Sequence, residues 1–458
     1  MLKITTTILL LTLFAACVTE PEQKETPEID GPDGVILMTL DPGHFHAALI
    51  QKSMYDAVDS TVYVYAPEGA EVKDYFDKID SYNAREDNPT GWETKAYIGD
   101  DFLEKMIEQK PGNVMVVAGK NNKKIDYILA AVKAGINVYA DKPLVINKEG
   151  FKKLEKAYEI AEENGVMIYD IMTERFEETT AMQKQFSMIP EIFGELIDGT
   201  PEEPAISKES VHHFSKIVSG KPLIRPAWFF DVEQEGEGIV DVTTHLVDLV
   251  QWEAFPEQII DRSEVEMLKA RHWTTTLTPT EFEKVTGLTS FPDYLQKDVV
   301  GGNLNVLCNG EMLYKIKGKH AKVSVIWNFE APAGTGDTHY SIMRGSKANL
   351  IIKQGKAENY KPTLYIQLNN PENGTERLES VLNSTINQTF AGTSVEKTAD
   401  DVWKVTIPSE FKLGHEAHFA QVTENFLNYL KAGKLPGWEI PNILTKYHTT
   451  TTAYEMAQ

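Results

Sequence analysis

The chain has 458 residues, of which 42% are hydrophobic and 25% are charged. This composition is typical of a soluble globular protein with about two or three domains. Asp and Glu (68 residues) outnumber Lys and Arg (45 residues), so the formal net charge is −23 at pH 7. Because such an acidic surface repels phosphate backbones, we expect no nucleic-acid partner.

The first residues have the layout of an export signal. Lys3 precedes an apolar stretch, residues 4–16, that is too short to span a bilayer stably. Its end, "FAAC", resembles the signal of bacterial lipoproteins, which implies cleavage before Cys17 and acylation of that thiol. Residues 1–16 are then a signal peptide and residues 17–33 an acidic tether. The alternative is a plain secretory signal with an incidental cysteine.

A lipid on Cys17 anchors the protein in the cell envelope without a spanning helix, either facing the periplasm or exposed on the outer membrane. Cys308 is then the one remaining cysteine. A single free thiol excludes an intramolecular disulfide and a zinc cluster built from cysteines.

Residues 34–175 alternate apolar stretches of strand length with helical stretches. The predicted strands are "GVILMTL", "STVYVYAP", "NVMVVAG", "INVYADKP" and "VMIYDIM", and "HAALIQKSMYDAV" after the first strand is predicted to be a helix. Continuous apolar strands separated by helices indicate a parallel sheet covered on both faces, here a Rossmann-like nucleotide-binding domain. Such sheets bind ligands at the carboxyl ends of their strands.

Residues 176–458 show a different pattern. After a helical stretch, segments such as "NLNVLCNGEMLYKIKG" and "HAKVSVIWNFEAP" alternate apolar and polar residues. Alternation predicts a mostly antiparallel, open sheet with one wet face. We therefore expect an α+β domain for substrate binding and oligomerisation, with residues 369–400 as an exposed polar excursion.

Two motifs carry residues suited to proton transfer. "ADKP" places Lys142 at the end of the fourth predicted strand, and "GEGIVDVTTHLVDLVQW" places Asp241 four residues before His245. Asp248, three residues further on, lies near the same helix face. In one crevice, the ammonium group stabilises an alkoxide, the imidazole exchanges the proton and the aspartate fixes the imidazole tautomer.

Together these motifs resemble the Gfo/Idh/MocA family, whose members carry Glu-Lys-Pro at a strand end and Asp-x-x-x-His on a helix of the second domain. "MTERF" and "PAWFFD" resemble two further segments of that family, in the same chain order. The resemblance implies NAD(P)-dependent oxidation of a secondary hydroxyl, or reduction of a keto group, on a sugar, glycoside or cyclitol. It implies that the catalytic residues are Lys142, His245 and Asp241. We expect substrate contacts from Trp228, Arg225, His213 and Asp241.

The turn after the first strand departs from the family's G-x-G-x-x-G/A pattern. In "LDPGHFHAALI", Asp41 replaces the first glycine, Gly43 keeps the second and His46 replaces the third. A helix still follows this turn, so its N-terminus can hold an anion, and His44 or His46 can pair with phosphate. The residues expected to bind NAD or NADP are Gly43, His44, Phe45, Glu68, Ala118, Asn121, Asp141, Lys142 and Arg175.

Other interpretations remain open. The protein can be an NAD-assisted glycoside hydrolase or lyase of the same family, or a lipid-anchored carbohydrate-binding protein without a cofactor. A metal site needs more ligands than Asp41, His44 and His46, and no spacing selects among His212, His213, His339, His415 and His418. We therefore assign no metal. The family resemblance also favours a homo-oligomer formed through the open face of the second sheet.

Overall fold

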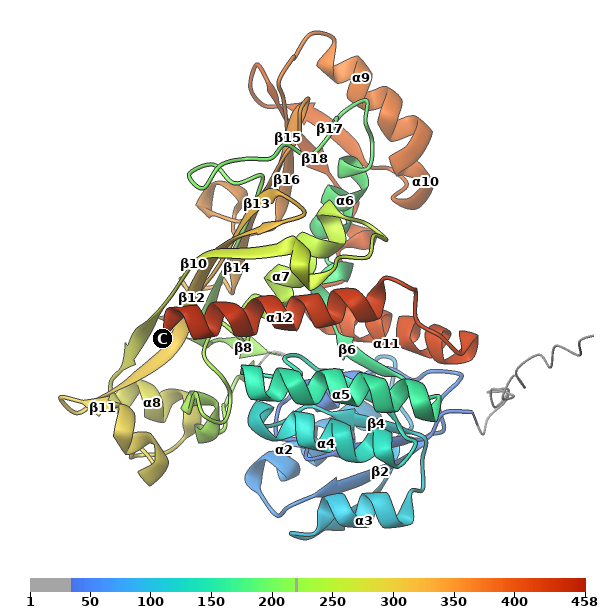
Figure 1. Cartoon of the computed structure of the whole chain (residues 1–458), viewed down its shortest axis with the longest axis vertical. Coiled ribbons are helices and arrows are strands. Elements are labelled where there is room, and N and C mark those ends of the chain that lie inside the picture. The colour runs from blue at the N-terminus through green and yellow to red at the C-terminus, as the bar shows by residue number, and fades with distance from the viewer. Residues whose placement is uncertain (1–33, 219–220) are drawn as a thin grey trace, which may run out of the picture.

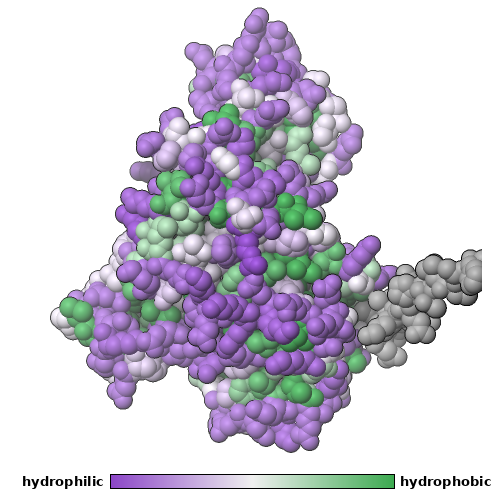
Figure 2. Space-filling model, viewed as in Figure 1, coloured by the Kyte–Doolittle hydropathy of each residue, from purple (hydrophilic) through white to green (hydrophobic). Residues whose placement is uncertain are grey.

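The structure, a computed structural model, describes residues 34–218 and 221–458 and contains two large sheets (Figure 1). The predicted signal peptide, Cys17 and the acidic tether lie outside these residues. Among the helices of the described residues, none is both long and apolar enough to cross a membrane. Figure 2 shows a face that is mainly hydrophilic, interrupted by smaller apolar areas.

The first sheet has six parallel strands in the order β3-β2-β1-β4-β5-β6, which confirms the predicted Rossmann-like sheet. The sequence predicts five of these strands and misses β3, "ETKAYI", because this edge strand is largely exposed and carries no apolar run. The strands are β1 (Leu37–Leu40), β2 (Thr61–Ala66), β3 (Glu93–Ile98), β4 (Val114–Val117), β5 (Asn137–Asp141) and β6 (Ile168–Ile171).

Helices cover both faces of this sheet because successive strand residues point to opposite sides. Leu37 and Val116 pack in a cluster with α1, α2 and α11, whereas Met38 and Val117 pack with α3, α4, α5 and α12. The helices from the first part of the chain are α1 (His46–Ile50), α2 (Ala70–Ala84), α3 (Phe102–Gln109), α4 (Asn121–Lys133) and α5 (Lys148–Asn164).

Helix α1 is much shorter than the predicted helix over "HAALIQKSMYDAV". It ends at Ile50, and the chain then continues in turns. Tertiary contacts explain this end: the side chain of Gln51 accepts from the hydroxyl of Tyr75, and its carbonyl accepts from the indole N–H of Trp92.

The second sheet is mixed and mostly antiparallel, as predicted, and its β7 and β13 pair in parallel. Its strand order is β10-β12-β13-β7-β14-β15-β16-β18-β17, with β11 beside β12, while β8 and β9 form a separate pair. The strands are β7 (Ile206–Ser215), β8 (Ile217–Val218), β9 (Lys221–Pro222), β10 (Val265–Leu277), β11 (Val299–Val300), β12 (Asn303–Ile316), β13 (Lys319–Glu330), β14 (Thr338–Arg344), β15 (Ala348–Lys353), β16 (Thr363–Leu368), β17 (Ser394–Lys397) and β18 (Val402–Thr406).

The buried face of this sheet packs against α6, α7 and α12. The helices of this part are α6 (Glu178–Ser187), α7 (Thr243–Ala254), α8 (Pro279–Thr286), α9 (Gly374–Val381), α10 (Asn387–Thr389), α11 (His415–Ala432) and α12 (Glu439–Ala457). Shorter helical turns are η1 (Thr173–Phe176), η2 (Ala227–Phe230), η3 (Arg262–Glu264), η4 (Asp293–Asp298), η5 (Lys356–Glu358), the π-helical η6 (Leu382–Ile386) and η7 (Ser409–Phe411).

Residues 369–400, predicted to be an exposed excursion, are partly helical and partly packed into the core. This segment contains α9, η6, α10 and β17, and it buries Leu378, Leu382 and Ile386 in the core of the second sheet. Its few apolar residues stand at helical spacing among many polar ones, so the sequence pattern does not indicate the helix.

The last two helices both pack on the parallel sheet, and α12 also packs against β10 of the second sheet. The ring of Phe426 in α11 stacks on Tyr139 of β5 at 4.6 Å, and the hydroxyl of Thr423 bonds that of Tyr139. In α12, the Lys446 Nζ lies 2.7 Å from Asp170 of β6 and 2.9 Å from Asp248 of α7. Figure 1 shows α12 lying across the junction between the parallel sheet and the second sheet.

Candidate active site

A cavity of about 750 Å³ lies between the carboxyl edge of the parallel sheet and the second sheet. Its walls contain seven of the chain's eleven histidines: His44, His46, His212, His245, His339, His415 and His418. These residues come from segments far apart in the sequence, so their convergence could not be read from spacing.

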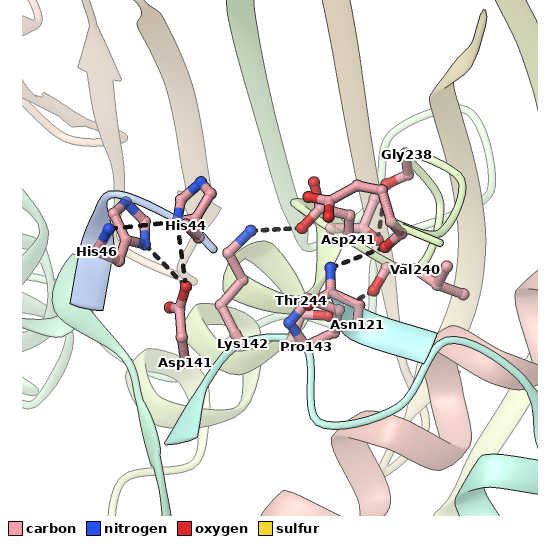
Figure 3. A network of polar contacts seen from close by, with 12 residues as sticks. His44, His46, Asn121, Asp141, Lys142, Pro143, Gly238, Val240, Asp241 and Thr244 are labelled. Atoms are coloured by element: carbon pink, nitrogen blue, oxygen red, sulfur yellow. Dashed lines mark hydrogen bonds and ion pairs between the residues drawn. The ribbon is translucent and has the colours of Figure 1, made fainter. Parts of the chain in front are cut away.

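Lys142 and Asp241 meet at one wall of this cavity. Lys142 follows β5, and its Nζ donates to Oδ1 of Asp241 at 2.5 Å, with both side chains about nine-tenths buried (Figure 3). Burial alone would lower the pKa of Lys142, but the carboxylates of Asp241 and Asp141 outweigh it and raise that pKa. Lys142 is therefore a fixed ammonium ion at neutral pH.

His245 is a neutral base at the same cavity. It lies in the first turn of α7, and burial together with the nearby Lys142 lowers its pKa to about 3. Among the described residues, its Nδ1 has no hydrogen-bond partner. Because Asp241 pairs with Lys142, the carboxylate does not fix the imidazole tautomer as the sequence suggests.

Arg175 and Asp248 form a buried ion pair away from the cavity. The guanidinium group donates to both carboxylate oxygens of Asp248, at 2.6 and 2.7 Å, and lies 2.9 Å from Glu439. These donors of Arg175 are used inside the protein, and its role in cofactor binding stays a prediction. Asp248 likewise supports the fold beneath His245.

The turn around Gly43 is covered by the second part of the chain. The buried Trp228 lies over it so closely that an added Cβ on Gly43 would be 3.3 Å from its ring. The indole N–H of Trp228 donates to Glu71 of α2 at 3.1 Å. Trp228 does not line the cavity, and its contact with substrate stays a prediction.

The backbone donors of this turn are also used internally. The N–H of Gly43 donates to the carbonyl of Asp41 at 2.7 Å, and that of His44 donates to Ala118 at 3.0 Å. Asn121, another predicted cofactor residue, donates to the carbonyl of Glu235 at 2.8 Å and lies outside the cavity. A pyrophosphate placed over Gly43 therefore does not fit this conformation.

The other end of the expected cofactor groove is open. Lys142, His44 and Phe45 line the open cavity. Glu68, beyond the end of β2, is exposed, and its role in binding the adenosine ribose stays a prediction. The turn around Gly43 is thus covered by Trp228, whereas Lys142, His44 and Phe45 face the open cavity.

His44 and His46 both face Asp141 at the end of β5. The Nδ1 of His46 lies 2.9 Å, and that of His44 3.6 Å, from Oδ2 of Asp141 (Figure 3). Burial lowers the pKa of both imidazoles well below the usual range, which keeps them neutral. The expected pairing with a phosphate is thus replaced by a contact with a carboxylate, whereas Asp41 turns away and accepts from Tyr127.

The opposite wall comes from the second sheet. Arg225 lines the cavity as expected, but its guanidinium group donates to the carbonyls of Phe214 and His213, and burial lowers its pKa to about 10. The imidazole of His213 lies 3.3 Å from Asp337 and is not part of the wall, and its contact with substrate stays a prediction. The neighbouring His212 lines the cavity in its place.

Several cavity residues escape the sequence analysis. Glu235 is buried beside Asp241, and burial and that carboxylate raise its pKa, which favours a protonated acid. Asp337 accepts from Lys216 at 2.6 Å, and Glu174 lies 3.4 Å from His415. No motif marks these residues, although Glu174 stands within the "MTERF" segment that resembles the family.

Comparisons with known proteins agree with this architecture. A family model described as "Putative oxidoreductase C terminal domain" matches residues 182–458, more than half of the chain. A crystal structure described as a "putative oxidoreductase" from Parabacteroides merdae is 54% identical and has a TM-score of 0.91, covering 93% of this chain and 98% of that one. A search of curated proteins finds no match.

More distant structures share the fold. Levoglucosan dehydrogenase in complex with NADH and levoglucosan is 11% identical, with a TM-score of 0.58 over 92% of this chain and 96% of that one. GenD2 of gentamicin A biosynthesis, in complex with NAD, is 11% identical, with a TM-score of 0.56 over 96% and 97%.

The family match and the close structural relative define the class of protein, an oxidoreductase with a Rossmann-like domain and a second, mostly antiparallel domain. The chain belongs to the Gfo/Idh/MocA-type oxidoreductases that carry this C-terminal domain.

Proposed function

We propose that the protein transfers hydride between NAD or NADP and a carbon that bears a secondary hydroxyl or keto group, on a sugar, glycoside or cyclitol. The observation that carries this proposal is the convergence of Lys142 from the first domain and His245 from the second on one cavity. The distant fold neighbours with NADH, NAD and levoglucosan support the choice of cofactor and substrate class.

In the direction of oxidation, the neutral imidazole of His245 accepts the hydroxyl proton. The ammonium group of Lys142, held by Asp241, stabilises the oxygen as its negative charge develops. A bound NAD or NADP would supply hydride acceptance, by which an alcohol that has lost one proton and one hydride becomes a ketone.

Binding of an extended dinucleotide requires Trp228 to leave Gly43. We propose that cofactor binding displaces this ring and breaks its bond to Glu71. Gentle purification followed by absorbance and mass analysis tests for bound dinucleotide, and titration with NADH and NADPH tests for binding. An empty protein that binds neither one contradicts the redox proposal.

Mass analysis of a panel of glycosides and keto-glycosides, incubated with the protein and either dinucleotide, identifies the substrate. A mass change of two hydrogens supports oxidation or reduction. Cleavage of the glycoside instead supports the hydrolase or lyase alternative.

The covered Gly43 favours a second candidate, a carbohydrate-binding protein without a cofactor. Sugar binding by calorimetry in the absence of any turnover supports this candidate. Export, acylation of Cys17 and a homo-oligomer formed through the second sheet also remain proposals, and mass analysis of the N-terminus and ultracentrifugation test them.

A further inference from the structure

Three side chains from two strand ends converge beside the cavity, and two of them line its wall. His44 and His46 belong to the turn after β1, and Asp141 is the last residue of β5. One candidate ligand atom from each residue lies within 4.8 Å of those of the other two. Figure 3 shows both imidazoles directed toward the same carboxylate.

The distances fit a shared cation. In a tetrahedral site with ligands at about 2.1 Å, neighbouring ligand atoms lie about 3.4 Å apart. The Nδ1 atoms of His46 and His44 lie 2.9 and 3.6 Å from Oδ2 of Asp141, on either side of that value. Two imidazoles and one carboxylate are a donor set that divalent zinc and iron both accept.

Hydrogen bonding alone leaves one of these contacts unexplained. The His46 imidazole can donate to Asp141 at 2.9 Å, but Nδ1 of His44 is 3.6 Å away, beyond a hydrogen bond. That Nδ1 instead accepts from the backbone N–H of His46, at 3.4 Å, so its lone pair and the carboxylate are two acceptors at close range. A cation between them removes this repulsion. Lys142 cannot serve as that cation, because its ammonium group is paired with Asp241.

We propose that His44, His46 and Asp141 bind a divalent transition-metal ion such as Zn²⁺ or Fe²⁺. Three protein ligands leave at least one coordination position free, as in catalytic metal sites. Because His44 and His46 line the cavity, this position is available to water or to an oxygen of a ligand. The ion site goes beyond the redox proposal, because metal binding requires neither dinucleotide nor sugar.

Metal content tests this site directly. The purified protein, stripped with a chelator, is dialysed against Zn²⁺ or Co²⁺ and analysed for metal per chain and for the visible absorption of bound Co²⁺. We expect one ion per chain. Loss of a residue that only supports a metal ligand lowers metal affinity about 10- to 100-fold. Because they remove a ligand itself, His44→Asn, His46→Asn and Asp141→Asn should each lower the affinity for the ion by at least that much.

His339→Asn is the matched control, because His339 lines the same cavity outside the triad. It should keep the ion with unchanged affinity. The site is refuted if the unmodified protein takes up no metal, if the triad variants bind as tightly as the unmodified protein, or if His339→Asn loses the ion.

Where a triad variant does not fold, anomalous diffraction from the zinc-loaded protein decides the position of the ion. An ion at any other place overturns the proposal. Since these assays contain no dinucleotide and no sugar, their failure is distinguishable from failure of the redox proposal.

Discussion

The carboxyl ends of β1 and β5 lie at one edge of the parallel sheet, with β4 between them, but they differ in what they offer a ligand. The end of β5 presents Lys142 to an open cavity. The turn after β1 holds Gly43 beneath Trp228 and uses its backbone donors within the protein. The open end of the expected cofactor groove, at Lys142, is suited to proton transfer. The filled end, at Gly43, is where pyrophosphate was expected, and it is covered by Trp228. The predictions below test each half separately.

The largest effect is expected from Lys142→Met, which removes the cation at the open end. Turnover should fall about 100-fold or more, as with loss of a donor that stabilises an oxyanion. The variant also leaves Asp241 buried without its partner, which costs about 3–5 kcal/mol of unfolding free energy. Kinetics and denaturant unfolding measure the two effects.

The double variant Lys142→Met/Asp241→Asn separates these effects. It should recover most of the stability, because no unpaired charge remains, while turnover stays low. Full turnover in the single variant would show that the ammonium group has no part in the reaction.

His245→Asn removes the base and should lower turnover about 100- to 10,000-fold. Because burial and Lys142 lower the pKa of His245 to about 3, the imidazole stays neutral well below pH 6.5. The kcat/KM of the unmodified protein should therefore not fall as the pH drops through 6.5. His448→Asn, on α12 and outside the cavity, is the control. An acid limb centred on pH 6.5 that disappears in His245→Asn would contradict the lowered pKa.

Glu71→Ala tests the filled end by releasing Trp228 without removing its ring. Loss of this hydrogen bond, worth about 1 kcal/mol, should make displacement of the indole easier and raise NADH affinity roughly fivefold. Fluorescence titration measures the change, with Asp74→Ala on the same helix as control. Equal affinities in both variants would show that Trp228 does not compete with the cofactor.

The smallest effect concerns acid stability and arises from His418 in the cavity wall. Burial lowers the pKa of His418, so the unfolded chain binds more protons below about pH 6.5 and stability declines as the pH falls. Each such histidine contributes up to about 1.4 kcal/mol per pH unit in that window. His418→Asn should reduce the slope of the unfolding free energy against pH, measured by denaturant unfolding at several pH values between about 4 and 8. An unchanged slope would mean that the pKa of His418 is the same in the folded and unfolded states.

Much of the fold could be predicted because buried strands have a recognisable pattern of apolar residues. Strands β1 and β4, buried on both faces, read as continuous apolar runs, and β12 shows the alternation of a half-exposed strand. The edge strand β3 has no such mark, and the end of α1 depends on contacts with Tyr75 and Trp92 that no local pattern contains.

The candidate site divides in a similar way. Local motifs indicated Lys142 and His245, and their catalytic roles stay predictions. A local motif cannot show which distant residues bind a given side chain. Arg175 pairs with Asp248 and Glu439, and Trp228 donates to Glu71, and none of these partners is near in the sequence. The same limit hid the approach of Asp141 to the two histidines, since only the folded sheet brings the strand ends together.

Helix α12 has a consequence for how ligands exchange. Its Lys446 bridges carboxylates from β6 and α7, so a buried ion cluster joins the two halves of the molecule. A hinge-like separation would break this desolvated ion cluster. Entry and exit are therefore expected to proceed by rotation of individual wall side chains, at a rate set by local repacking.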